Sequence, residues 1–521
     1  MSGRRAVTLA AVLLGFLALP MLMSGTTVAL PRIGADLHAS GAALQWVVVG
    51  YFLAAAAMML VAGSLGDLFG RRRVFAAGAA VYSVGALASA LAGDILLLNA
   101  ARTISGLGAA GVMAGGGAVL GATFTGSART RAYAAMGTTA GVGMAVGPTL
   151  SGWLVGALGW RATFALFAGA GLLMLAGAIG MADSRAGGRP RPDGSHLDGP
   201  HLDGPRPDGP HLDGSHLDGP RPDGPQSDGP RLDVRGALTL IGALTLTLVG
   251  VNQAADAGWA SPVVLLTLVA GLALFVTFFL IERRTLHPVL DLGLLRDRRF
   301  MAWTLAGLIL AAGPAGVIAY LPTYLQAAAG ASVQGAGLTM LMLTTPVLLL
   351  PQVGGFLINR GVPPRALVAV SLSLIAAGNA WLSTLHPGIT AAGLLAPLVT
   401  IGTGMGLMIG TTDAQAVNQV AQEHIGMATG LLNTVRAGGG ALATTLFGTA
   451  LVTVLHARTG EPAQAARIAA GELAEPALEA ALLTGAWQTA LWCTAGVCAA
   501  ATLAVWALLG SARLATTTAA H

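Results

Sequence analysis

The sequence contains no lysine, only two cysteines and few charged residues of any kind. Charged residues make up 10% of the 521 residues and hydrophobic residues make up 54%. A soluble domain is roughly 25% charged, and a water-soluble fold of this length has too little interior to cover so much apolar surface. The composition therefore indicates a protein whose solvent is a lipid bilayer.

The scarce residues also exclude several functions. Cys493 and Cys498 are too few and too close for a disulfide framework or a thiolate metal site. The sequence has no phosphate-binding glycine loop, no H-E-x-x-H motif and no nucleophile elbow. We therefore expect no metal, no cofactor and no enzymatic activity. The arginines are scattered through short loops, which favours a membrane-orientation signal over a nucleic-acid surface, so we expect no nucleic-acid partner.

Fourteen apolar segments are long enough to cross a bilayer, which takes about 20 helical residues. They cover residues 8–30, 44–65, 73–93, 96–121, 132–157, 162–182, 236–254, 260–281, 300–323, 335–358, 366–385, 390–412, 426–455 and 484–510. Arg4 and Arg5 precede the first segment as they would in a signal peptide. That segment is too long for one, and another span follows it, so we expect an uncleaved helix.

The arginines are distributed unevenly between the two alternating sets of loops. Most fall in the set that contains Arg71, Arg72, Arg73, Arg129, Arg131, Arg283, Arg284, Arg296, Arg298, Arg299, Arg360 and Arg365. The other set holds Arg32, Arg161, Arg458 and Arg467. Because cytoplasmic loops carry the excess of positive charge, we expect a cell-membrane protein with both termini in the cytoplasm. This arrangement requires an even number of spans.

A compositionally foreign segment divides the chain. Residues 191–230 are eight tandem pentapeptides of the form [R/H/Q]-[P/L/S]-D-G-[P/S], with almost nothing apolar to build a core. We predict a disordered cytoplasmic linker over 183–235. It would separate an N-terminal six-helix bundle, 1–182, from an extra transmembrane hairpin, 236–285, and a C-terminal six-helix bundle, 286–521.

The loop after the second span has the frame G-x-x-x-D-x-x-G-R-R, formed by Gly63, Asp67, Gly70, Arg71 and Arg72. The glycines allow a tight turn and a close helix approach. The acid and the arginines can bind a neighbouring helix in one conformation and release it in another. Basic residues alone would indicate a plain anchor, but the frame is more specific, so we interpret these five residues as a conformational latch.

Arg102 lies a few residues inside an otherwise apolar span. A charge near the bilayer centre costs roughly 2.5–3.5 kcal/mol on insertion scales, and such residues are usually functional and face a cavity. Alternatively, the side chain reaches the outer surface, because Asp94 and Asn99 mark that interface nearby.

The fifth span contains Gly143, Gly147, Pro148 and Gly152. A Gly-Pro step bends a helix, and small residues allow a partner helix to approach its backbone. Generic small-residue packing is the alternative, although the conjunction G-x-x-x-G-P-x-x-S-G is less common than that.

In order and in position, these three motifs resemble those of the major facilitator superfamily, and specifically its fourteen-span drug:proton antiporter branch. The stretches 282–292 and 426–436 also resemble segments of that branch. The resemblance implies an all-α membrane protein with two six-helix bundles and an extra two-helix hairpin between them. One position departs from the branch: Leu22 stands where its first helix has an acid implicated in proton coupling.

Few acids are left that could couple transport to protons. Asp413, at the inner end of the twelfth span, is one coupling candidate, and the Arg102 environment is the other. Asp413 could instead pair with Arg436 or be a solvated loop acid. For the substrate cavity we expect contributions from Trp46, Tyr51, Tyr320, Tyr324 and Gln326, although aromatic residues can equally be interface anchors.

The sequence thus predicts secondary active efflux of small apolar or amphipathic organic compounds, by alternating access and in exchange for protons. An uptake permease or a uniporter not coupled to protons is the first alternative, favoured by Leu22. A membrane sensor that does not transport is the second, and the intact motifs at Asp67, Arg102 and Gly147 count against it.

Overall fold

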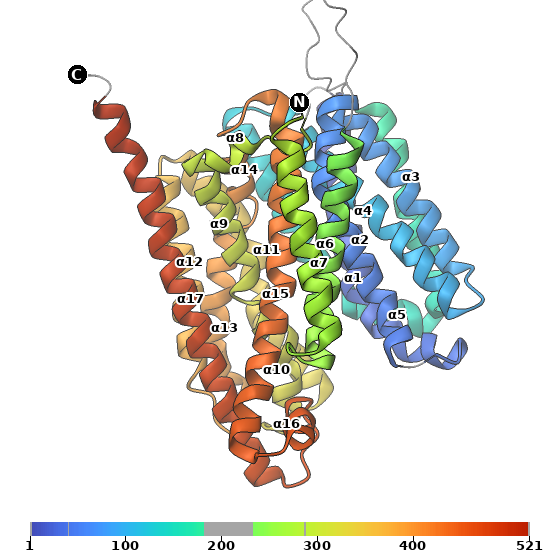
Figure 1. Cartoon of the computed structure of the whole chain (residues 1–521), viewed down its shortest axis with the longest axis vertical. Helices are drawn as coiled ribbons and strands as arrows, with labels where there is room; N and C mark the ends of the chain where they lie inside the picture. Colours follow the sequence, from blue (N-terminus) through green and yellow to red (C-terminus); the bar gives the residue numbers. More distant parts are fainter. Residues whose placement is uncertain (1–2, 40, 182–232, 286–287, 519–521) are drawn as a thin grey trace, which may run out of the picture.

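The computed structural model describes residues 3–39, 41–181, 233–285 and 288–518. All regular structure in these ranges is helical, and they contain no strand. The linker predicted over 183–235 lies outside them except for its last three residues. Figure 1 shows long helices packed side by side, with the start of α1 and the end of α17 at the same end of the bundle.

The helices fall into three consecutive groups along the chain. The N-terminal half contains α1 (Gly3–Asp36), α2 (Gly41–Phe69), α3 (Arg71–Ala90), α4 (Ile95–Thr123) and α5 (Gly126–Gly180). The hairpin consists of α6 (Val234–Ala257) and α7 (Pro262–Glu282). The C-terminal half contains α8 (Leu292–Arg296), α9 (Arg298–Ala312), α10 (Ala315–Ala327), α11 (Val333–Asn359), α12 (Pro364–Leu382), α13 (Ala391–Met408), α14 (Thr411–Val417), α15 (Ile425–Thr459), α16 (Pro462–Ala469) and α17 (Pro476–Thr518), with the 3-10 turn η1 (Gln422–His424) before α15.

Helix α5 contains two crossings of the bundle, which explains its length of 55 residues. Its backbone leaves the helical region at Gly159, where φ is 81° and ψ is 164°. Before this point Gly143 packs against the backbone of Leu17 in α1, and after it Gly177 packs against Ala11, nearer the start of α1. The chain therefore runs along α1, turns at Gly159 and returns.

The helices account for the predicted spans. In the described part of the chain, 13 helices are long and apolar enough to cross a membrane, and the one counted within α5 is Leu150–Gly180. The one predicted span not counted separately, 132–157, corresponds to the first arm of α5. The all-helical membrane fold expected from the sequence is confirmed.

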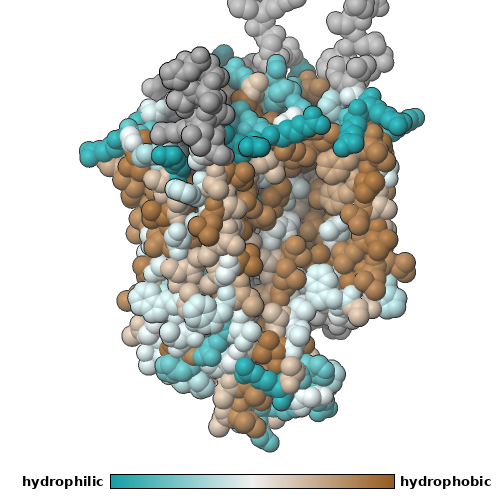
Figure 2. Space-filling model, turned by 60° about the vertical axis from the view of Figure 1, so that its left-hand side comes forward, coloured by the Kyte–Doolittle hydropathy of each residue, from teal (hydrophilic) through white to brown (hydrophobic). Residues whose placement is uncertain are grey.

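Polar residues gather at one end of the bundle, above a wide belt of apolar side chains (Figure 2). Because Asp67 lies there, at the last turn of α2, we call it the latch end. The other end contains Asp36, whose carboxylate accepts hydrogen bonds from Trp160 Nε1 at 2.8 Å and Arg161 Nη1 at 3.3 Å. This contact ties the end of α1 to the turn within α5.

The turn at Gly159 provides a test of the two-arm description of α5. Its φ of 81° with extended ψ is a conformation that side-chain-bearing residues strongly disfavour. A Cβ there would meet no atom within 4 Å, so backbone strain alone should destabilise Gly159→Ala, by about 1–3 kcal/mol. We expect a lower unfolding temperature for the purified protein in detergent.

Gly156→Ala is the matched control. Gly156 is exposed, and a Cβ there, as at Gly159, would meet no atom within 4 Å, but its backbone is helical. Alanine should be neutral or stabilising there, by up to about 1 kcal/mol. Equal unfolding temperatures for the two variants would contradict the assigned turn.

Candidate functional site: a latch between the two halves

The Asp67 carboxylate joins the two halves of the protein. It lies at the end of α2, and it accepts hydrogen bonds from the backbone N–H groups of Gly426 at 2.9 Å and Met427 at 2.7 Å. These residues begin α15, where N–H groups have no partner within the helix and the helix dipole is positive. Asp67 therefore caps a helix of the opposite half.

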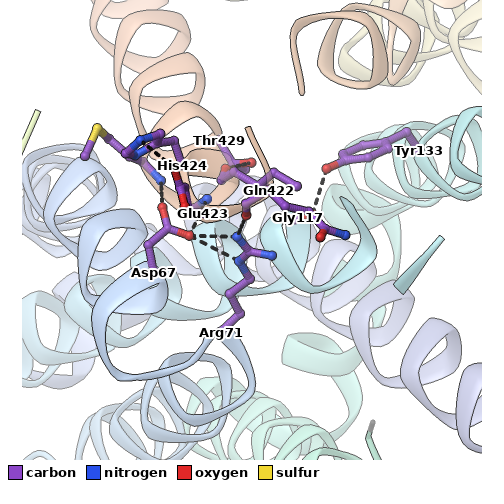
Figure 3. Close-up of polar contacts among 11 residues, drawn as sticks. Asp67, Arg71, Gly117, Tyr133, Gln422, Glu423, His424 and Thr429 are labelled. Carbon is purple, nitrogen blue, oxygen red and sulfur yellow. Dashed lines mark hydrogen bonds and ion pairs between the residues drawn. The ribbon is translucent and has the colours of Figure 1, made fainter. Parts of the chain in front are cut away.

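Arg71 neutralises the carboxylate on its other side. Its Nε and Nη2 atoms lie 3.1 and 3.0 Å from Asp67 Oδ1, and Nη2 also donates to the carbonyl oxygen of Gln422. The Arg71 side chain is 3% exposed. Figure 3 shows Asp67, Arg71 and the segment that contains Gln422 meeting at one point. A buried pair of charges is stable only when its remaining hydrogen-bonding groups are satisfied, and backbone groups of the opposite half satisfy them here.

Gly63 and Gly426 allow the close approach that the cap requires. A Cβ on either residue would collide with the carbonyl oxygen of the other, and a Cβ on Gly426 would also lie 2.7 Å from Asp67 Oδ1. Gly70 serves a different purpose, since its φ of 102° turns the chain between α2 and α3.

Arg72, the fifth residue of the predicted latch, does not reach the other half. Its Nε donates to the carbonyl oxygen of Ala178 at 2.7 Å and its Nη2 donates to that of Ile179 at 2.8 Å. These carbonyls end α5, where the helix dipole is negative and a cation is favourable. The structure thus brings Gly63, Asp67 and Arg71 together at the junction, and Arg72 braces the N-terminal half.

A second contact between the halves lies at the same end. Arg129 Nη1 donates to Asn418 Oδ1 at 2.7 Å, just beyond α14. The backbone of Gly410, where α14 begins, packs directly against that of Tyr133 in the first arm of α5. The Tyr133 hydroxyl is buried and donates to the carbonyl oxygen of Gly117 at 2.7 Å. The latch end is therefore closed by two separate pairs of elements.

Arg102 is buried completely inside the N-terminal half and does not reach the surface. Its Nε donates to the carbonyl oxygen of Val47 at 3.1 Å. Its guanidinium carbon lies 4.3 Å from the ring centre of Tyr51 and 5.4 Å from that of Phe164. Both terminal nitrogens lack a hydrogen-bond partner among the described residues. Arg102 is a buried cation stabilised mainly by aromatic faces.

Asp413 is buried, with 6% of its surface exposed, and forms an ion pair with Arg436 of α15. Of the three possibilities for Asp413, the solvated loop acid is wrong, because α14 packs it inside the C-terminal half. The two coupling candidates therefore lie apart, with Arg102 in one half and Asp413 in the other. Their part in coupling stays a prediction.

The antiporter motif lies along the first arm of α5 and faces α1. Beyond Gly143, a Cβ on Gly25 of α1 would lie 3.2 Å from the carbonyl oxygen of Gly147, and Gly152 lies opposite Val28. The backbone remains helical through Pro148, and the non-helical dihedral angles within α5 are those of Gly159. Small residues thus allow α1 and α5 to pack closely, and the functional role of the motif stays a prediction.

The cavity candidates in α2 differ in their surroundings. Trp46 is 39% exposed, whereas Tyr51 is buried with its ring against Arg102. Trp46 therefore keeps an exposed surface in this conformation, whereas the Tyr51 ring is in contact with the buried guanidinium of Arg102.

The cavity candidates in α10 belong to an aromatic cluster in the C-terminal half. The ring of Tyr320 stacks on Phe447 at 6.0 Å, and the Tyr324 hydroxyl lies 2.8 Å from Thr484 Oγ1. Gln326 is exposed and donates to the carbonyl oxygen of Pro322. The five cavity candidates thus do not form one group, and their contact with substrate stays a prediction.

The comparisons with known proteins agree with this architecture. The family model of the Major Facilitator Superfamily matches residues 12–212 and 234–444. The chain therefore belongs to this superfamily, and it is a multi-pass membrane transporter for small molecules and not an enzyme. Among the described residues, no group of three His, Cys, Asp or Glu side chains is placed to hold a metal ion.

Its relatives include export proteins. The chain is 34% identical over 453 residues to the cephamycin export protein CmcT of Amycolatopsis lactamdurans, covering 84% of this chain and 83% of that protein. It is 30% identical over 452 residues to the tetracenomycin C resistance and export protein of Streptomyces glaucescens, covering 86% and 76% respectively. The human organic anion transporter MFSD10 shares the fold, with a TM-score of 0.55 at 14% identity, over 96% of this chain and 100% of that one.

The cap across the halves gives a prediction about conformation. Asp67→Asn removes the charge that neutralises Arg71 and one of the strong acceptors for the start of α15, a loss of several kcal/mol at a buried site. We expect the latch end to open. Spin labels on the exposed side chains at 73 and 423, in a background with both cysteines replaced by serine, should then show a new long-distance population by pulsed electron resonance.

Asp297→Asn is the control, because Asp297 also caps a helix, through the N–H groups of Arg299 and Phe300, but within one half. Its distance distribution should match that of the unmutated chain. An unchanged distribution for Asp67→Asn would show that the cap does not hold this end closed.

Proposed function

We propose that the protein exports small apolar or amphipathic organic compounds by alternating access between its two halves, in exchange for protons. The observation that carries the proposal is the Asp67 cap, a breakable polar contact that joins α2 of one half to α15 of the other. The printed names of the relatives, which export cephamycin and tetracenomycin C, support a drug-like substrate.

The orientation that we propose places the latch end, and with it both termini, in the cytoplasm. The arginine-rich loops support this orientation, since positive residues are retained on the cytoplasmic side. In that orientation the conformation described here is closed to the cytoplasm. The boundaries that we propose for the functional units remain 1–182, 236–285 and 286–521, with the linker of 183–235 between the first two.

Coupling to protons requires a group that can gain and lose one during the cycle. Leu22 is fully buried in α1, with 1% exposed, and it offers no such group. The Asp413 carboxylate can gain and lose a proton, and its ion pair with Arg436 would link that change to α15. A proton on the carboxylate would weaken the pair and free the arginine, which lies in the same helix that Asp67 caps. An uncoupled uniporter or uptake permease is the second candidate, and Leu22 is the observation that favours it.

The efflux itself is tested by expression in a host that lacks its own drug exporters. We expect cells with the unmutated chain to accumulate less of at least one compound in a broad panel of toxic organic molecules than cells with Asp67→Asn. Protein levels in the membrane should be equal. No difference for any compound, with both proteins present, would count against drug export.

Proton coupling is tested at Asp413. In inside-out vesicles, Asp413→Asn should abolish the uptake driven by a pH gradient, because an amide cannot carry the proton. Exchange of labelled for unlabelled substrate without a gradient should persist. Glu423→Gln is the matched control, since its side chain is 71% exposed and should not affect coupling. Gradient-driven uptake that survives Asp413→Asn would remove Asp413 as the proton carrier and leave the Arg102 environment as the coupling candidate. Absence of gradient-driven uptake in the unmutated chain would favour the uniporter.

A further inference from the structure

The residues just before α8 lie against the latch. We call residues 288–291 the strap. Val289 and Leu290 are 1% and 3% exposed, and they pack in one apolar cluster with Leu60 and Val61 of α2. A connecting loop is normally exposed because its backbone needs water as a hydrogen-bond partner, so this buried loop requires other partners.

The strap bonds to both sides of the latch. Ser64, one helical turn before Asp67, donates from Oγ to the carbonyl oxygen of Val289. On the other side, the N–H of Asp291 lies 2.9 Å from the sulfur of Met427, and Met427 is the residue whose own N–H binds Asp67. The strap therefore bridges α2 and α15 beside the Asp67 cap.

Glu282, the last residue of α7, holds the strap in this place. Its Oε1 accepts from the N–H groups of Val289 at 3.0 Å and Leu290 at 3.3 Å. The residue is 4% exposed, and its Oε2 has no hydrogen-bond partner among the described residues. Burying a carboxylate costs free energy. Its two hydrogen bonds to the backbone of the strap offset part of this cost.

The hairpin is fastened to the two halves in different ways. Toward the N-terminal half, Leu248 of α6 packs against Leu53 and Ala56 of α2 through apolar contacts, which allow sliding. Toward the C-terminal half, Trp259 Nε1 donates to Thr449 Oγ1 of α15 at 2.9 Å, a directional bond. The chain also continues from the strap directly into α8.

We propose that Glu282 is a positioning residue of the transport cycle. It fixes the strap to the hairpin so that hairpin, strap and C-terminal half move as one body, and the strap closes on Ser64 as a second arm of the latch. When the latch end opens, the Ser64 bond breaks together with the Asp67 cap. This inference rests on the alternating access of the proposed function, but on neither its substrate nor its protons.

Two cross-linked variants test which half carries the hairpin. In a background with both cysteines replaced by serine, one variant has cysteines at Ser64 and Val289, and the other has them at Trp259 and Thr449. Each pair is joined by the same short bis-thiosulfonate linker and later released by a reductant. Opening is read as amide hydrogen exchange in the peptide that contains Gly426 and Met427, whose N–H groups bind Asp67.

Linking Ser64 to Val289 should lock the latch end and slow exchange about tenfold, the equivalent of one net hydrogen bond, and the reductant should restore it. Linking Trp259 to Thr449 should leave exchange unchanged, because both residues move together. The reverse pattern would show that the hairpin moves with the N-terminal half and would overturn the proposal. Equal effects of the two links would also overturn it.

Variants of Glu282 test its own part. Glu282→Leu removes the acceptor for the strap and should speed exchange at Gly426 and Met427 about tenfold. Glu282→Gln keeps an acceptor oxygen and should behave like the unmutated chain. Rapid exchange in both variants would assign the effect to the charge, and unchanged exchange in Glu282→Leu would leave the strap without a role. Either result would overturn the proposal.

This readout separates the inference from the function proposed above. Hydrogen exchange needs neither a substrate nor a proton gradient, so it remains valid if the protein proves to be a uniporter. Failure of drug export with the expected exchange pattern would overturn the proposed function alone. Normal export with an unexpected exchange pattern would overturn the role of Glu282 alone.

Discussion

The junction between the two halves at the latch end is built around one carboxylate, Asp67, which caps the start of α15. Each half is held together by packing along its helices, and Asp67 joins α2 of one half to α15 of the other through a charged contact beside the uncharged packing of the junction. A charge at a helix terminus is worth about 0.3–2 kcal/mol, and a hydrogen bond to a charged group about 1.5–3 kcal/mol. Interactions of this size hold a conformation, yet a ligand that prefers the other conformation can overcome them.

The cost of burying a charge also explains the partners of the other buried charged residues. Asp67 and Asp413 each have an arginine partner, so neither leaves an uncompensated charge in a medium of low dielectric constant. Arg102 is different, because aromatic rings and one carbonyl oxygen replace the carboxylate. Cation–π contacts recover only about 0.5–2 kcal/mol. Arg102 is therefore a buried cation whose charge is only partly compensated, and its part in coupling stays a prediction.

Much of the fold could be predicted from the sequence, because apolar segments of fixed length are what a bilayer selects. The spans followed from composition, and the expectation that the Asp67 loop binds a neighbouring helix followed from its motif. The partners of Asp67 did not, because they are the backbone N–H groups of Gly426 and Met427, about 360 positions away, and a backbone group has no signature of its own. The surroundings of Tyr320 and Tyr324 could not be predicted either. An aromatic residue that faces a ligand and one that packs in an aromatic cluster look alike in sequence.

Asp67 and Glu282 are both buried carboxylates that are stabilised by backbone N–H groups. Both acids lie in the last turn of a membrane helix, both are largely buried, and both accept hydrogen bonds from two consecutive backbone N–H groups. Backbone bonds of this kind depend on the position of a segment, and at α15 they also require Gly426, because a Cβ there would lie 2.7 Å from Asp67 Oδ1. Through Glu282, the hairpin holds the strap at the junction, beside the cap that Asp67 forms on α15.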